Sequence, residues 1–77
     1  MIIITFHQLT DALMFEDAAK KIEKDFRLIP VPRKISSSCG LSGKSSLPIE
    51  DIKSILEEKK IDFDGIYLEE GDNYTKL

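Results

Sequence analysis

The stretch Arg-Leu-Ile-Pro-Val-Pro at residues 27–32 constrains how the rest of the chain is arranged. Its aliphatic and β-branched residues predict a strand. Pro30 and Pro32 lie two residues apart, so both remove an N–H donor from the same side of that strand, which only an edge strand tolerates. The pair also discourages another chain from pairing with that edge. Residues 27–32 are therefore predicted to form the edge of a sheet.

The residues before this edge predict a strand and then a helix. Residues 2–6 form a short run rich in isoleucine, which is typical of a central strand with both faces at least partly covered. Thr10 or Asp11 is the predicted N-cap of the helix that follows. Apolar residues then recur at spacings of three and four, so one stripe of the helix faces the sheet. The stripe consists of Ala12, Phe15, Ala19, Ile22 and Phe26.

The residues after the edge strand predict a third strand, a second helix and a fourth strand. Residues 40–46 can form a short strand, although two glycines, Gly40 and Gly43, weaken this prediction. The second helix opens within residues 47–51, with Ser46 as its cap and a proline in its first turn. Residues 63–68 predict the last strand. From Glu69 onward the chain is polar and is expected to fray.

This order of elements predicts an α+β fold of the ferredoxin-like βαββαβ type. The expected sheet is antiparallel and four-stranded, in the order 4-1-3-2, with two helices on one face. Strand two is an edge in that order, in agreement with its prolines. Residues 1–70 are assigned to this single domain and residues 71–77 to a polar C-terminal tail. The helix-free face would carry apolar surface of strand one, as a homodimer or partner surface or as an apolar face of a monomer.

Length and composition exclude several classes of protein. The chain has 77 residues and a net charge of −3, which leaves room for one small domain and disfavours non-specific binding to nucleic acid. No apolar run approaches the roughly 20 residues of a membrane-spanning helix. One cysteine and one histidine give no zinc-ligand pairs, and no cofactor-binding motif is present. The start without a leader and the single thiol predict a cytoplasmic protein.

The charges are unevenly distributed along the chain. Residues 26–47 contain none of the fourteen acidic side chains, yet they hold four basic ones and six serines. Such a segment can present N–H groups and positive charge to an anion. Alternatively, it is a solvated turn whose serines satisfy backbone groups.

The segment Ile-Pro-Val-Pro-Arg-Lys-Ile-Ser-Ser-Ser-Cys-Gly-Leu at residues 29–41 resembles the signature of the selenium/sulfur (Se/S) carrier protein-like family of small bacterial proteins. The resemblance extends over nearly the whole chain, through Thr-Phe-His at 5–7, Asp-Ala-Leu at 11–13 and Gly-Ile-Tyr at 65–67. It implies a ferredoxin-like domain whose cysteine, here Cys39, holds sulfur or selenium for handover between a donor and an acceptor protein.

The chemistry of a carrier assigns candidate roles around Cys39. An exposed thiolate attacks the donor persulfide and then holds the transferred atom as an anion. Basic side chains would favour the thiolate, hydroxyl groups would donate hydrogen bonds to the anion, and a glycine would leave room for a partner protein. The candidate basic side chains are Arg33, Lys34 and Lys44. Ser37 and Ser38 are the candidate hydrogen-bond donors, and Gly40 is the glycine. Alternatively, Cys39 is a small buried apolar residue.

His7 is the one histidine that could act as a base toward Cys39. The strand after Cys39 is expected to run parallel to the first strand, which would separate the two residues by the length of the sheet. His7 is therefore predicted to be a loop or helix-entry residue.

Three functions remain open from the sequence. The first is a sulfur or selenium carrier that is not a stand-alone enzyme. The second is a non-catalytic regulatory module that binds an anion through the loop or a protein through the open sheet face. The third is a structural adaptor in which the loop is only a turn.

Overall fold

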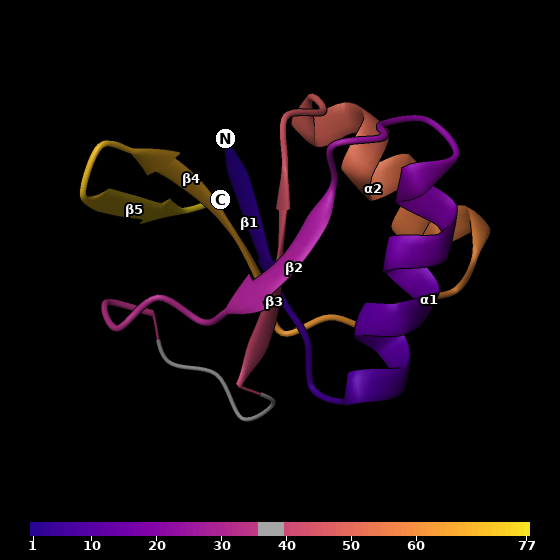
Figure 1. The fold of residues 1–77 in the computed structure, drawn as a ribbon, viewed down its shortest axis with the longest axis horizontal. Coiled ribbons are helices and arrows are strands. Elements are labelled where there is room, and N and C mark those ends of the chain that lie inside the picture. Colours follow the sequence, from indigo (N-terminus) through magenta and orange to yellow (C-terminus); the bar gives the residue numbers. More distant parts are fainter. Residues whose placement is uncertain (36–39) are drawn as a thin grey trace.

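The computed structural model describes residues 1–35 and 40–77. Both helices lie on one face of an antiparallel five-stranded sheet (Figure 1), and the predicted α+β class is confirmed. The elements are β1 (Ile2–Thr5), α1 (Leu9–Lys20), β2 (Arg27–Pro30), β3 (Leu41–Ser45), α2 (Ile49–Glu58), β4 (Gly65–Glu70) and β5 (Asn73–Lys76).

The sheet differs from the prediction in its number of strands. Its order is β2-β3-β1-β4-β5, in place of the predicted four-stranded order 4-1-3-2. The pairs β2–β3, β3–β1 and β1–β4 occur in both orders, and β5 is added beyond β4. The sheet therefore ends on β5 rather than on β4.

The expected fraying after Glu69 is wrong, because residues 73–76 form β5 and pair with β4. The connection is a two-residue loop, Gly71-Asp72, closed by the pair Glu70 and Asn73. Gly71 has φ +60°, a conformation that glycine adopts without steric cost. Gly-Asp between two strands is a typical hairpin sequence, so a local signal for β5 was present in the chain.

The edge position predicted for β2 is confirmed. The Val31 N–H donates to the Gly40 carbonyl at 3.1 Å, so Val31 faces the neighbouring strand. Pro30, the residue before it, turns outward by the alternation of a strand, so its missing N–H group lies on the side where no strand pairs. Because β2 ends at Pro30, Pro32 lies beyond the strand, at the start of the turn that the Ile35 N–H closes.

The core lies between the sheet and the helices. Ile2, Ile4 and Phe6 point into it from β1 and the residue after it, and Phe15 packs between Phe6 and Phe26 with ring centroids 5.8 and 5.4 Å apart. Such aromatic contacts add to the stabilisation from buried area.

The predicted apolar stripe of the first helix is only partly right. Because α1 ends at Lys20, Ile22 lies beyond the helix and is 62% exposed. Phe26 also lies beyond the helix, yet it is buried because it reaches the core from the connection to β2. The spacing of apolar residues by three and four therefore extends beyond the end of the helix and does not mark where the helix ends.

Both predicted helix caps are wrong. α1 begins at Leu9 with Gln8 before it, so Thr10 and Asp11 lie inside the first turn. α2 begins at Ile49, after Pro48, and neither helix has a side-chain cap. Glu23, in the α1–β2 connection, accepts hydrogen bonds from the backbone and hydroxyl of Ser46. Glu23 therefore links the α1–β2 connection to the β3–α2 connection, which contains Ser46.

The sheet face without helices is not the exposed apolar surface that the sequence predicted. Ile3, which points to this face, is fully buried. Its partners in the neighbouring strands are Lys44 and Tyr67. Residues 31–35 extend on this side of the sheet toward the β4–β5 turn (Figure 1). The chain thus covers the apolar surface of β1 with its own residues.

Candidate functional site

The loop that carries the candidate residues is closed at its base by one backbone hydrogen bond. Val31 N–H donates to the Gly40 carbonyl, which brings the end of β2 next to the start of β3. Within this loop the structure describes residues 32–35 and Gly40. Cys39, Ser37 and Ser38 lie outside the described residues. Their predicted roles therefore stay predictions.

Arg33 and Lys34, two of the predicted basic residues, are the central residues of a turn. The Ile35 N–H donates to the Pro32 carbonyl at 2.9 Å, which closes the turn. Lys34 Nζ donates to the Asp72 carbonyl oxygen in the β4–β5 loop at 2.7 Å. Arg33 is exposed, and no carboxylate of the described residues forms an ion pair with it. A hollow of about 240 Å³ lies between this turn and β5, lined in part by Arg33, Lys34 and Tyr74.

Lys44 lies four residues beyond Gly40, within β3, and has an acidic partner. Its Nζ is 3.2 Å from Glu69 Oε1 in β4. Since β3 and β4 flank β1, this ion pair crosses the central strand. The second oxygen of Glu69 accepts a hydrogen bond from Tyr74 at 3.2 Å. Desolvation first, and then the hydrogen bond and charge of Glu69, raise the pKa of Tyr74, so its phenol stays protonated at neutral pH.

The three serines of this segment that the structure describes all have hydrogen-bond partners. Ser42 Oγ donates to the Ile29 carbonyl at 3.2 Å, and Ser45 Oγ accepts from the Leu47 N–H at 3.0 Å. Ser46 binds Glu23. Ser42 and Ser45 thus satisfy backbone groups, as the alternative interpretation predicted, but both are buried in β3 rather than in a solvated turn. Ser46 instead binds a side-chain carboxylate.

The predicted parallel orientation of β1 and β3 is wrong, and it also disagrees with the antiparallel sheet that the order of elements predicted. The two strands are antiparallel, with Thr5 opposite Ser42 as their last pair. His7 lies two residues after Thr5 and Gly40 two residues before Ser42, so both lie at the same end of the sheet. Figure 1 shows the exit from β1 and the start of β3 at this end. The separation that the sequence analysis expected between His7 and the cysteine loop was derived from the wrong strand direction.

Residues 1–68 match the model of a protein family described as Putative Se/S carrier protein-like. The chain belongs to this family. The match includes the whole cysteine loop and ends within β4, so β5 lies beyond it. Comparison with curated proteins and with solved structures finds no match.

Two further properties bear on the family's chemistry. Within residues 1–35 and 40–77, no three His, Cys, Asp or Glu residues are grouped as metal ligands. The same part of the chain contains no helix long and apolar enough to cross a membrane.

Gly40 has a conformational role at the base of the loop. Its φ is +80°, and a Cβ built there would meet no atom of the described residues within 4 Å, its chain neighbours apart. We therefore expect Gly40→Ala to destabilise the fold by about 1 kcal/mol, from backbone strain rather than from a clash. Gly40→Asn should cost less, since asparagine tolerates the left-handed region. Urea unfolding of both variants measures the difference, and equal costs would contradict this explanation.

Proposed function

We propose that the protein carries sulfur or selenium as a persulfide or selenide on Cys39 and passes it from a donor protein to an acceptor protein. The observation that supports this most is the family match, which spans the loop containing the only cysteine. Arg33 and Lys34 add two positive charges to the described part of that loop. Lys44 is not included in the proposed site, because it lies within β3, four residues beyond Gly40, and its ammonium group points to Glu69 across β1.

The proposed transfer requires no cofactor and no net oxidation. The Cys39 thiolate attacks the outer sulfur of a donor persulfide. The donor's S–S bond breaks as the new S–S bond forms on Cys39, and the donor leaves as a thiolate that takes a proton from water. Attack by an acceptor thiolate on the outer sulfur reverses these steps. Because the thiol must stay reduced between transfers, a reducing compartment such as the cytoplasm suits this function.

The experiment that tests the function is intact-mass spectrometry after incubation with a low-molecular-weight persulfide. We expect a gain of about 32 Da, one sulfur atom, which dithiothreitol removes. A thiol that stays unmodified in the native protein, yet reacts freely once the protein is unfolded, would contradict the proposal. The protein would then be better explained as a binding module with a structural cysteine.

We further propose that His7 assists the thiol of Cys39. His7 lies at the same end of the sheet as Gly40, which follows Cys39 in the sequence. A histidine near a thiol can accept its proton or stabilise its thiolate.

We expect His7→Gln to slow alkylation of Cys39 by iodoacetamide at pH 7 by about tenfold, because alkylation follows the fraction of thiolate. Gln8→Ala is the matched control, since Gln8 is the exposed neighbour of His7. Alkylation at the wild-type rate in His7→Gln, with unchanged folding, would return His7 to the role of a loop residue.

A further inference from the structure

A pair of like charges lies on the helix-free face of the sheet, away from the cysteine loop. Arg27 in β2 is directly opposite Lys44 in β3, and both side chains therefore point to the same face. Like charges in opposite positions destabilise a sheet. The chain has 14 acidic and 11 basic residues, so a shortage of acidic residues does not explain why two basic residues face each other.

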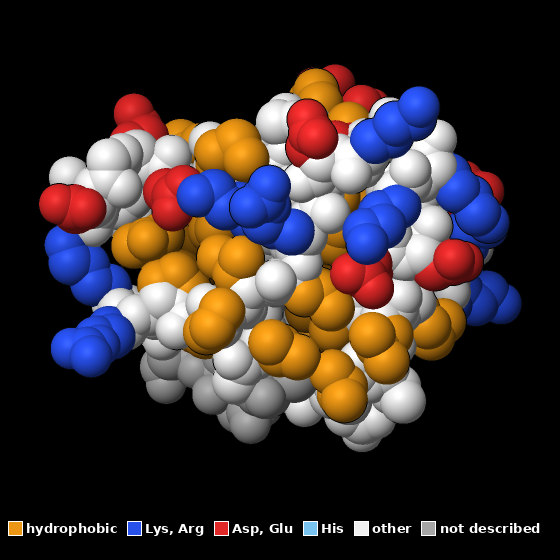
Figure 2. Space-filling view, viewed as in Figure 1, with side chains coloured by type: hydrophobic (Ala, Val, Ile, Leu, Met, Phe, Trp, Pro, Cys, Tyr) orange, Lys and Arg blue, Asp and Glu red, His pale blue; other side chains and the backbone are white. Residues whose placement is uncertain are grey.

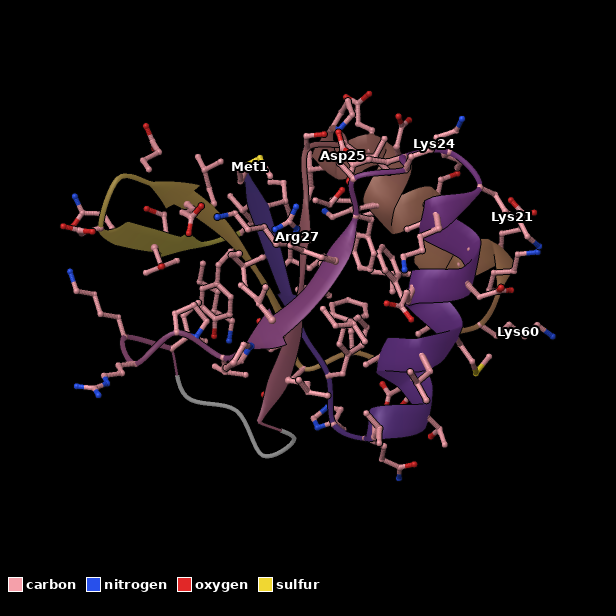
Figure 3. All side chains as sticks on the ribbon, viewed as in Figure 1. Met1, Lys21, Lys24, Asp25, Arg27 and Lys60 are labelled. Carbon is pink, nitrogen blue, oxygen red and sulfur yellow. The ribbon has the colours of Figure 1, made fainter. Side chains whose placement is uncertain are left out.

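The two basic residues line a hollow of about 580 Å³, together with Met1, Asp25 and Ile29. Figure 3 shows Met1, Asp25 and Arg27 around the same end of the sheet. Figure 2 shows basic side chains grouped over this region, with apolar and acidic side chains beside them. The volume is in the range of sites for small ligands, roughly 300–1,000 Å³.

The charges of this hollow are only partly compensated. Lys44 forms its ion pair with Glu69, but an ammonium group has three donors and so has capacity for a second acceptor. Arg27 forms no ion pair with any carboxylate in residues 1–35 and 40–77, although Asp25 lines the same hollow. Its guanidinium group is exposed and has five N–H donors. An oxyanion between Arg27 and Lys44 would remove the repulsion between them and use these donors.

We propose that this hollow binds a small organic oxyanion, with its carboxylate or phosphate group between Arg27 and Lys44 and its apolar part on Met1 and Ile29. Arginine binds both groups through two parallel hydrogen bonds. The site is separate from the carrier chemistry: Lys44 lies four residues along β3 from Gly40. The proposal therefore does not depend on the proposed function.

The test is titration of the full chain with hexanoate, phenyl phosphate and inorganic phosphate at constant ionic strength, followed by amide chemical shifts. We expect saturable shifts confined to residues 2–3, next to Met1, and to residues 25–29 and 43–45. The tighter binder of hexanoate and phenyl phosphate identifies the preferred head group. Inorganic phosphate has no apolar part, so weaker binding of inorganic phosphate than of the other two anions supports the apolar contact.

Arg27→Gln should weaken this binding at least tenfold and, without anion, should raise the melting temperature because the repulsion is removed. Lys53→Gln is the control, since it removes one positive charge from an exposed position in α2, on the other face of the sheet, and it should bind as the wild type does. Absence of saturable shifts with all three anions would overturn the proposal. So would equal weakening in the two variants, or binding of a polyglutamate peptide but of no small anion, which would assign the surface to an acidic protein segment.

Discussion

Replacing Cys39 with serine is expected to abolish sulfur loading while leaving the fold intact. Serine has nearly the same size but cannot form a persulfide, so the gain of about 32 Da should disappear entirely. A carrier thiol has to be accessible to its partner proteins, so its replacement should remove little buried surface. Intact-mass spectrometry and thermal unfolding of the same sample measure the two effects together.

The matched control moves the thiol by one residue, in the double variant Ser38→Cys, Cys39→Ser. This variant keeps one cysteine in the loop but moves it away from Gly40, and we expect it to be alkylated yet to load sulfur less than the wild type. Equal loading by the control would mean that any exposed thiol suffices. A large loss of stability in Cys39→Ser would instead indicate that Cys39 is a buried structural residue.

Adding a methyl group at Gly43 is expected to produce the largest loss of stability. A Cβ at this position would lie 2.7 Å from Cζ of Phe26 and 3.7 Å from Cε2 of Phe6, both in the core. Alanine favours folding slightly by restricting the unfolded chain, but the buried ring has to move. We expect Gly43→Ala to destabilise the protein by about 1–3 kcal/mol, a typical cost of overpacking. Urea unfolding measures this change.

Two variants make the explanation specific. Gly65→Ala introduces the same group in β4, where the nearest atom is 3.1 Å away on the half-buried ring of Tyr67, and it should cost less. Phe26→Leu makes room at Gly43, so the double variant with Gly43→Ala should lose less stability than the sum of the single variants. Additive effects would mean that the contact between Gly43 and Phe26 does not cause the loss.

These glycines show where sequence patterns reach their limit. In the sequence, Gly43 weakens the prediction of a third strand, since glycine has no side chain to pack there. In the structure it belongs to β3 because the ring of Phe26 occupies the space of its missing side chain. That contact joins residues 17 positions apart, so no local pattern could indicate it.

The sequence by itself determined the α+β class, the two helices and the edge position of β2. Each of these depends on local properties: periodic apolar residues, strand propensity, and prolines that lack an N–H donor. The antiparallel direction of β1 and β3 is already contained in the antiparallel sheet that the order of elements predicts, so the separation expected between His7 and Gly40 was an error of topology. The tertiary structure alone decided the burial of Ile3 and the pairing of Arg27 with Lys44. Both follow from contacts between distant segments, and a composition or a spacing does not contain such contacts.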